Sequence, residues 1–337
     1  MISGMLEKLL ARQNLTIQEM SEVMNAMMSG ASTPAQTAGF LIALRMKGET
    51  IDEVTGAAMS MRKHASFINA GTENVVDTCG TGGDKANTFN ISTAAAFVAA
   101  GAGVTIAKHG NRSVSSKCGS ADVLAAAGFN LDVEPAVMEQ CIQENGIGFL
   151  FAPKVHPAMH YVVPIRRELG VRTIFNMLGP LTNPAGATGQ ILGVYSPVLT
   201  EMFAHVLQML GVKRAMVVHG MDGLDEITCT DSTRVTELRN GVIKTYELFP
   251  DMLIGETFSA ESLKGGGPEQ NAKIMLDILS SRLSGGPRAV TLLNAAAAII
   301  AGCKADTMED GLKLAEKSID SGAALEKLEI MIGASRK

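Results

Sequence analysis

Residues 77–93, DTCGTGGDKANTFNIST, combine glycines with hydroxyl and amide side chains between an apolar strand and a helix that begins near Ser92. Glycine lets backbone N–H groups approach phosphate oxygens without obstruction by a side chain, and a helix N-terminus adds unpaired N–H groups. Thr88, Asn90 and Thr93 supply further hydrogen-bonding groups. The segment is a candidate phosphate cradle, and a plain tight turn is the alternative. Its spacing matches neither GxxxxGKS/T nor GxGxxG, which disfavours a nucleoside triphosphatase or a dehydrogenase.

A second polar loop, residues 108–122, reads KHGNRSVSSKCGSAD and also lies between an apolar strand and a helix. Lys108 and Arg112 can neutralise phosphate charge, and the serines can donate hydrogen bonds. His109 can contact a substrate or shape the turn, and both readings stay open. A solvated loop rarely needs this mixture of groups, so the second loop favours the phosphate interpretation of the first.

A third loop, residues 220–228, reads GMDGLDEIT and follows an apolar strand that ends near His219. Its adjacent carboxylates, Asp225 and Glu226, lie where ligands of α/β sheets bind, at the carboxyl end of a strand. Oxygen ligands of this kind suit Mg²⁺, which keeps waters and shares substrate phosphates. A solvated acidic turn is the alternative for the pair taken alone.

The elements that position these loops differ between the two parts of the chain. In the first 65 residues, Thr16 and Thr50 each precede a glutamate by three positions, the spacing of a capping box, and Pro34 follows Thr33 as in a first helical turn. Three short helices are predicted there. Methionines at helical spacing between positions 20 and 28 are predicted to be core, with a partner surface as the alternative.

After Gly71 the sequence alternates between strands and helices, with strand candidates at 148–151, 190–195 and 214–219. Residues 235–248 are typical of a β-hairpin with its turn at Asn240 and Gly241. A mixed or parallel sheet with flanking helices is therefore predicted, ending in antiparallel strands, and helices return beyond about residue 265.

Composition agrees with an α or α/β protein and excludes several classes. The 337 residues are 46% hydrophobic but only 4% aromatic, with no Trp, and this length favours two domains. With 29 basic and 34 acidic residues and no basic run, no nucleic-acid footprint is visible. Five cysteines without a CxxC pair suggest neither disulfides nor zinc, and a reducing cytoplasm fits best. The charged N-terminus is unlike a signal peptide, and the apolar residues 292–301 number about half of the ~20 that a membrane span needs.

Four segments in this order, GTGGDKANTFNIST, KHGNRSVSSKCGSAD, HPAMHYVVPIRRELGVRTIFNMLGPLTNP and DGLDE, resemble the anthranilate phosphoribosyltransferase family. The resemblance runs from about residue 75 to residue 226. It implies a small helical N-terminal domain, residues 1–70 with about 165–178, and a larger α/β domain with a central mixed sheet, residues 71–164 and 179–337. It also implies a homodimer that contacts through the helical domain. Two substrates must be enclosed away from water, and glycine or proline near Gly71, Pro164 and the Gly179-Pro180 turn offers hinges for closure.

The activity implied by the resemblance joins the amine of anthranilate to the anomeric carbon of phosphoribosyl pyrophosphate, with Mg²⁺, in tryptophan biosynthesis. It implies that Ser92, Asp225 and Glu226 bind the metal. No residue is assigned with certainty as a catalytic base, and Lys108 and Arg112 are expected to assist the reaction electrostatically. For anthranilate the implied residues are Gly80, His109, Asn111, Arg166, Gly179 and Pro180. For phosphoribosyl pyrophosphate they are Gly80, Gly83, Asp84, Thr88, Asn90, Ile91, Ser92, Thr93, Lys108, His109, Gly110, Asn111, Arg112, Ser113, Val114, Ser115, Ser116 and Ser120.

Two other functions are weighed against this one. A pyrimidine nucleoside phosphorylase shares the fold, but KHGNRS and LGPLTNP argue against it. A non-catalytic relative that binds nucleic acid would be expected to show eroded motifs and a basic groove, whereas this chain keeps the motifs and is acidic. Cys79 and Cys118 are interpreted as small loop residues. His156 and His160 have metal-compatible spacing on a predicted helix but lack the glutamate of HExxH, so they are interpreted as structural.

Overall fold

Seven strands form one mixed sheet in the order β3-β2-β1-β4-β5-β6-β7. The computed structural model describes residues 2–84, 86–113 and 117–337. Neighbours among the first five strands of this order are parallel, and β6 and β7 are antiparallel to their neighbours. The strands are β1 Val75–Asp77, β2 Thr105–Gly110, β3 Ile147–Phe151, β4 Gly189–Gly193, β5 Arg214–Gly220, β6 Thr233–Arg239 and β7 Val242–Leu248.

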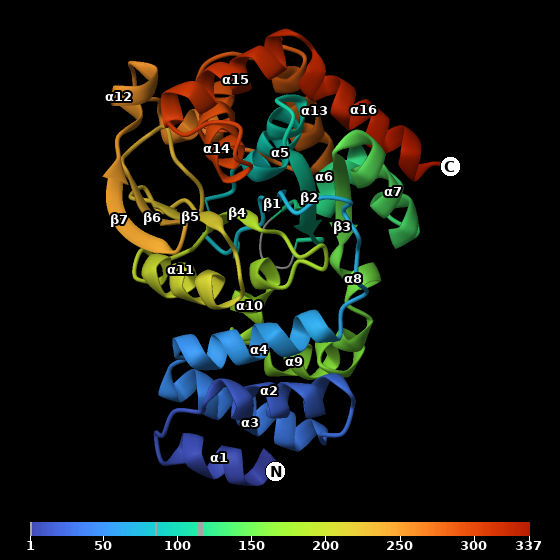
Figure 1. Cartoon of the computed structure of the whole chain (residues 1–337), viewed down its shortest axis with the longest axis vertical. Coiled ribbons are helices and arrows are strands. Elements are labelled where there is room, and N and C mark those ends of the chain that lie inside the picture. Colours follow the sequence, from blue (N-terminus) through green and yellow to red (C-terminus); the bar gives the residue numbers. More distant parts are fainter. Residues whose placement is uncertain (1, 85, 114–116) are drawn as a thin grey trace.

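Helices cover both faces of this sheet and form a separate bundle at one end of the molecule (Figure 1). The bundle contains α1 Ile2–Leu10, α2 Ile17–Met28, α3 Pro34–Lys47 and α4 Ile51–Lys63, with α9 Val163–Leu169 packed beside α3. The helices of the α/β part are α5 Ile91–Gly101, α6 Ser120–Ala126, α7 Pro135–Asn145, α8 Ala152–Val155, α10 Phe175–Leu178, α11 Leu199–Met209, α12 Pro250–Ile254, α13 Pro268–Leu279, α14 Gly286–Ala301, α15 Met308–Asp320 and α16 Ala323–Ser335.

The strand order places a topological switch point at β1. From β1 the chain runs through α5 to β2 on one side, whereas β4 pairs with β1 on the other side. In open α/β sheets, ligands bind outside the carboxyl ends of strands at such a point. The glycine-rich loop that follows Asp77 leaves the sheet here.

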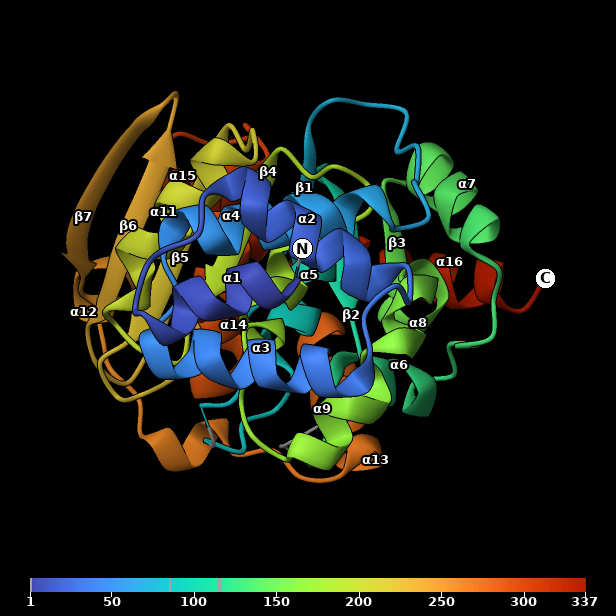
Figure 2. The ribbon, with the colours of Figure 1, turned by 90° about the horizontal axis from the view of Figure 1, so that it is seen from below.

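Residues on β4 and β5 alternate between two hydrophobic cores. Ile191 and Met216 belong to the core beneath α5, α14 and α16, whereas Leu192 and Val217 belong to the core that includes α11 and the bundle. This alternation follows from the two-residue period of a strand buried on both faces. The apolar core of the bundle is therefore continuous with one face of the sheet, and α4 and α11 lie between them (Figures 1 and 2). The division into two domains at the predicted boundaries stays a prediction.

The bundle confirms most of the predicted helical signals. Thr16 and Thr50 each complete a capping box, and Thr33 does so with Pro34 in the first turn. Met20 and the other methionines predicted as core in α2 are buried. The prediction of three helices was wrong by one, because α1 precedes them; this helix has no capping residue before it that would signal its start.

Two further predictions meet different outcomes. The hairpin is confirmed: β6 and β7 are joined by Asn240 and Gly241, both with positive φ. The helix predicted over His156 and His160 was wrong, because α8 ends before His156 and a 3-10 helix, Pro157–Tyr161, follows. Pro157 lies between the two histidines and has no backbone N–H to continue the α-helix, so the helix ends there. None of the helices in the described parts of the chain combines the length and apolarity needed to cross a membrane.

Candidate active site

The glycine-rich loop after β1 leaves several backbone donors available. The Thr81 N–H donates to Gly193 O at 2.8 Å, and the Gly82 N–H donates to Asp225 Oδ2 at 2.7 Å. The N–H groups of Gly80, Gly83 and Asp84 donate to no acceptor among the described residues. Unpaired N–H groups close together in a loop form an anion-binding nest. The predicted phosphate cradle therefore keeps three of its N–H groups without an acceptor in the described chain, and the adjacent N–H groups of Thr81 and Gly82 anchor it.

Close packing beneath this loop requires glycine at the end of β4. A Cβ at Gly193 would lie 1.5 Å from Asp225 O, which no rearrangement of a side chain can relieve. A Cβ at Gly80 would lie 3.1 Å from both Asp225 Oδ2 and Gly193 O. These contacts bring the glycine loop and the Asp225 loop, 143 positions apart, against each other.

Three carboxylates gather where these loops meet. Burial raises the pKa of Asp225 and of Glu226; repulsion from Asp84 adds to the rise at Asp225, and repulsion from Asp225 adds to it at Glu226. Lys108 opposes the rise at Glu226. Carboxylates that repel one another in a half-buried site have the donor set that a divalent cation prefers.

A small cavity beside Glu226 completes this site. Its volume is about 10 Å³, near the ~10–15 Å³ that a single water needs. Ser92 lies in its wall, and the Ser92 N–H at the start of α5 donates to Glu226 Oε1 at 3.2 Å. The Ser92 hydroxyl makes no hydrogen bond within the described chain. The cavity thus has a carboxylate oxygen and a hydroxyl oxygen in its wall and room for a small ion.

The loop that carries the carboxylates is fixed by two polar residues, the exposed Asp222 and the buried Asn294. Asp222 accepts hydrogen bonds from the Leu224 N–H at 3.2 Å and from the Thr228 hydroxyl at 2.6 Å. Asn294 of α14 accepts from the Ile227 N–H at 3.0 Å and donates to Ile227 O at 2.8 Å. The sequence did not identify Asn294, although it is the single amide in the apolar residues 289–301.

Asp77 and Asn183 form a buried polar support under the site. Asn183 donates to Asp77 Oδ2 and to Ala107 O, both at 2.7 Å, and its own oxygen accepts from the Ala185 N–H. Burial raises the Asp77 pKa to about 6, and nearby Lys108 opposes the rise. The Lys108 ammonium is itself buried and donates to Thr78 O at 2.9 Å. These bonds fix the end of β1 against β2.

His109 has a defined tautomer. Its Nδ1 lies 3.1 Å from Gly179 O, and because a carbonyl oxygen only accepts, Nδ1 carries the proton. Its Nε2 is then an acceptor, and it is buried without a hydrogen-bond partner in the described chain. His156 lies beside it, with ring centroids 5.0 Å apart, and neither nitrogen of His156 has a partner there. Burial lowers the pKa of His109 to about 3 and of His156 to about 4, so both rings are neutral near pH 7.

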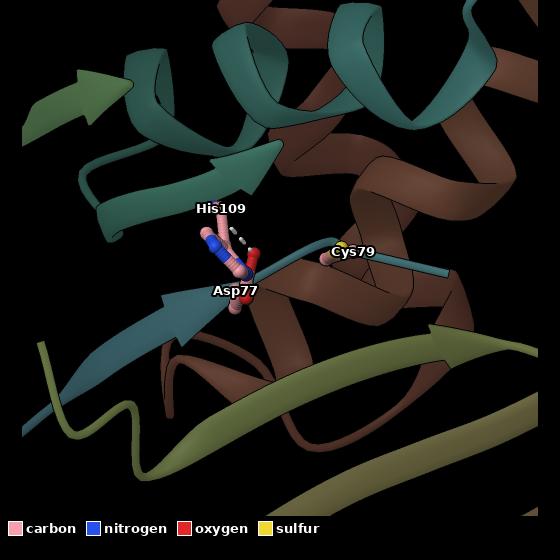
Figure 3. A group of neighbouring side chains, drawn as sticks. All are labelled: Asp77, Cys79 and His109. Atoms are coloured by element: carbon pink, nitrogen blue, oxygen red, sulfur yellow. Dashed lines mark hydrogen bonds between the residues drawn. The ribbon is translucent and has the colours of Figure 1, made fainter. Parts of the chain in front are cut away.

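Asp77, Cys79 and His109 place possible metal-ligating atoms within 4.8 Å of one another (Figure 3). Their existing bonds argue against a metal there. Asp77 Oδ1 accepts a hydrogen bond from the backbone N–H of His109, and Asp77 Oδ2 accepts one from the Asn183 side chain. Burial raises the pKa of Cys79, which keeps its thiol protonated and a poor ligand. The group is a structural junction between β1 and β2.

The second predicted loop is organised by Asp122 of α6. This carboxylate pairs with Arg112 at 3.0 Å and accepts from the N–H groups of Ser113 and Gly119, both at 2.9 Å. The Ser120 hydroxyl donates to Asn111 O at 3.3 Å. The predicted residues Val114, Ser115 and Ser116 lie outside the described residues.

Several residues predicted to bind phosphoribosyl pyrophosphate have structural partners. The Asn90 amide donates to Cys118 O and accepts from Asn271, so it links the first loop to the second and to α13. Thr88 forms an isolated bridge with Lys264, and the Ile91 side chain is buried in the core. The buried Thr93 hydroxyl lacks a partner in the described chain.

Arg166 is a half-buried cation without a carboxylate partner in the described chain. Its guanidinium lies 5.3 Å from the centroid of the Phe175 ring, and burial lowers its pKa. The segment from Arg166 to Gly179 connects directly to His109, because Gly179 O is the acceptor of the His109 ring. An unpaired, partly desolvated guanidinium is a natural partner for a carboxylate ligand.

Comparisons with known proteins agree with this fold and site. The model of the glycosyl transferase family helical bundle domain matches residues 3–65, and that of the family's a/b domain matches residues 72–325. A glycosyltransferase built from a helical bundle and an α/β domain is thus the class of protein that the fold defines. The anthranilate phosphoribosyltransferase of Syntrophobacter fumaroxidans is 55% identical over 98% of each chain. That of Acetivibrio thermocellus is 53% identical over 98% of this chain and 95% of its own.

Solved structures show the same relation. The anthranilate phosphoribosyltransferase of Thermus thermophilus superimposes with a TM-score of 0.93 and 42% identity over 98% of this chain and 99% of its own. The anthranilate phosphoribosyltransferase of Saccharomyces cerevisiae, in complex with PRPP and Mg, superimposes with a TM-score of 0.90 and 29% identity. The match covers 99% of this chain and 98% of the yeast chain. The chain belongs to the anthranilate phosphoribosyltransferase family. The predicted family, fold class and enzyme class are confirmed, whereas the roles of individual residues stay predictions.

Proposed function

We infer that the chain transfers the phosphoribosyl group of 5-phosphoribosyl 1-pyrophosphate to the amine of anthranilate, giving N-(5-phosphoribosyl)anthranilate and pyrophosphate, a step of tryptophan biosynthesis. One observation carries the inference to this site. The N–H groups of Gly80, Gly83 and Asp84, which have no acceptor among the described residues, lie at the switch point of the sheet, on the loop that bonds to Asp225. Backbone donors for phosphate and carboxylates for a metal are thus provided by loops in direct contact.

The pyrophosphate is proposed to bind the glycine loop, with Thr88, Asn90, Ser92 and Thr93 lining the approach to α5. Residues 108–113 and Ser120 provide the other wall, and Arg112 can reorient from Asp122 because its side chain is largely exposed. Asn90 and Lys108 act here through the bonds that hold the loops in place. These roles rest on the unpaired donors of the glycine loop and on the unpaired Thr93 hydroxyl.

Mg²⁺ is proposed to bind the carboxylates of Asp225 and Glu226 and the hydroxyl of Ser92. The residues fit a divalent cation, because the carboxylates repel one another and the cavity beside Glu226 has the size of one small ion. When bound, the ion would stabilise the charge of the departing pyrophosphate. Asp225 would continue to hold the Gly82 N–H, so metal and cradle share one support.

Anthranilate is proposed to bind between Arg166 and His109. Arg166 would bind its carboxylate, and the unprotonated Nε2 of His109 would accept a hydrogen bond from its amine. Gly80, Asn111 and the Gly179-Pro180 turn would complete the pocket. The neutral state of His109 matters, because a protonated ring would repel the N–H groups that it must accept.

The reaction then needs alignment more than acid or base catalysis. An aromatic amine is already nucleophilic, so holding it near the anomeric carbon supplies much of the rate enhancement. The backbone N–H groups of the glycine loop stabilise the charge that develops on the leaving group. Closure of the two parts of the chain would exclude water, which could otherwise attack the anomeric carbon in place of the amine and hydrolyse phosphoribosyl pyrophosphate.

A fluorescence assay tests the proposed activity. We expect loss of anthranilate emission when phosphoribosyl pyrophosphate and Mg²⁺ are added together, and none when either is omitted. Phosphate-dependent cleavage of thymidine without loss of anthranilate would instead identify a nucleoside phosphorylase. Salt-sensitive binding of single-stranded DNA without transferase activity would identify the nucleic-acid-binding alternative.

The chain is also proposed to form a homodimer through its helical bundle. Leu10 of α1 and Met46 of α3 are 71% and 73% exposed, an unusual exposure for large apolar side chains on one bundle. Light scattering coupled to size-exclusion chromatography tests this: a dimeric mass that Leu10→Glu and Met46→Glu together reduce to a monomeric one is expected. An unchanged mass in the double variant would exclude this surface.

A further inference from the structure

Arg172 connects two parts of the proposed site that are remote in sequence. It lies in the connector, residues 170–174, between α9 and α10. Its Nη2 donates to Gly83 O at 2.9 Å, and its guanidinium lies 4.7 Å from the centroid of the Tyr195 ring. Tyr195 follows β4. The Arg172 side chain therefore joins the connector to the glycine loop and to the residue pair after β4 that includes Tyr195.

The connector holds Arg172 in a defined place. Gly170 ends α9 in the left-handed conformation, with its N–H bonded to Arg166 O, and the Thr173 N–H donates to Asn176 Oδ1 at 3.0 Å at the start of α10. Arg172 lies between these two anchors. It therefore moves with the segment that carries Arg166.

We propose that Arg172 is a positioning residue that holds the glycine loop in its phosphate-binding conformation and couples it to the segment carrying Arg166. This inference rests on the proposed function of the loop. A peptide bond is planar and trans, so fixing Gly83 O also fixes the Asp84 N–H, which points the opposite way. That N–H is one of the three donors of the cradle that lack an acceptor in the described parts of the chain.

The loop is thereby held from two sides. Asp225 binds the Gly82 N–H, and Arg172 binds the carbonyl of the next residue. Gly83 has φ +86°, and a Cβ there would lie 2.3 Å from Arg172 Nη2, so this approach of the guanidinium requires glycine. Within the described chain no carboxylate pairs with Arg172, which leaves its charge to strengthen the bond to the carbonyl.

Hydrogen exchange of the substrate-free protein tests the positioning role directly. The Thr81 and Gly82 N–H groups are hydrogen-bonded, so their exchange reports how firmly the loop is held. Arg172→Ala should speed their exchange roughly tenfold, the effect of losing about 1.4 kcal/mol from a charge-assisted bond. Arg167→Ala is the matched control: it removes an exposed arginine of α9 that makes no side-chain bond within the described chain, and it should leave this exchange unchanged.

Steady-state kinetics test the consequence for binding. Arg172→Ala should raise KM for phosphoribosyl pyrophosphate by up to about tenfold, because fewer molecules have the binding-competent loop, and it should change KM for anthranilate and Tm much less. Tyr195→Phe keeps the aromatic face and should behave as wild type, whereas Tyr195→Leu should resemble Arg172→Ala. Because both act through one contact, the double variant Arg172→Ala/Tyr195→Leu should be no worse than Arg172→Ala alone.

Three results would overturn the proposal. Unchanged exchange in Arg172→Ala together with a raised KM would make Arg172 a direct phosphate ligand. An equal change in both KM values with a lower Tm would make it a general structural residue, and so would additive effects in the double variant. If the wild type transferred no phosphoribosyl group, the proposed function would fail, but the exchange measurement would still decide whether Arg172 holds the loop.

Discussion

Replacing His156 by Phe should make stability less sensitive to acid, because His156 is buried with neither nitrogen hydrogen-bonded in the described chain. An unfolded histidine has a pKa of about 6.5, whereas burial lowers that of His156 to about 4. Between these values the unfolded chain binds a proton that the folded chain does not. The folded state is therefore destabilised as pH falls from about 6.5 towards 4.

The magnitude follows from the two pKa values. Linkage gives a loss of about 2 kcal/mol for His156 between pH 7 and pH 5. His156→Phe has no histidine to protonate at this position, so it does not lose this free energy. Between pH 7 and pH 5, the unfolding free energy of the variant should therefore rise by about 2 kcal/mol relative to that of the wild type. Any packing cost of the larger ring is the same at both pH values and cancels in this comparison.

Urea unfolding at pH 7 and pH 5 measures this shift. The chain contains no Trp, so circular dichroism is the suitable signal. His160→Phe changes an exposed histidine four residues later and is the matched control for introducing a phenylalanine ring into this segment. If His156→Phe lost as much stability as wild type between the two pH values, the account of a neutral, unpartnered ring would be wrong.

Three further substitutions test other parts of the site. Gly193→Ala should abolish Mg²⁺-dependent binding of phosphoribosyl pyrophosphate in calorimetry, because the added Cβ would overlap Asp225 O. Gly333→Ala is the control and should bind normally, because a Cβ at Gly333 meets no neighbour. Equal binding by the two variants would refute the close packing at Gly193. Glu226→Ala should depress kcat much more than anthranilate binding, and an unchanged Mg²⁺ dependence of kcat would contradict its role as a ligand. Asn183→Ala should lower the free energy of unfolding by about 2–3 kcal/mol, because it leaves the buried Asp77 carboxylate and Ala107 O short of a donor; a change below about 0.5 kcal/mol in urea unfolding would show that the network is dispensable.

The sequence located the three loops because their chemistry is local. Glycines, cations and carboxylates each follow an apolar strand, and parallel strands bring their carboxyl ends to one edge of the sheet. The hairpin turn at Asn240 and Gly241 and the capping boxes of Thr16 and Thr50 were predicted for the same reason: each depends on residues within a few positions.

The rest of the site depends on contacts between distant segments. Arg172 reaches a glycine loop 89 positions away, and Asn294 holds Ile227 across 67 positions. Such pairings depend on strand order and helix packing, which local periodicity does not determine. The pairing of His109 with His156 was missed likewise, because the spacing of His156 and His160 suggested a helix that Pro157 interrupts.

The most direct test of the account is where the metal and pyrophosphate bind. Crystals soaked with Mn²⁺, which takes the same oxygen ligands as Mg²⁺, and phosphoribosyl pyrophosphate would reveal the ion by anomalous scattering. We expect the anomalous peak at the carboxylates of Asp225 and Glu226, and the pyrophosphate over the N–H groups of Gly80, Gly83 and Asp84. A peak at Asp77 and His109 instead, or pyrophosphate bound away from the glycine loop, would contradict the account.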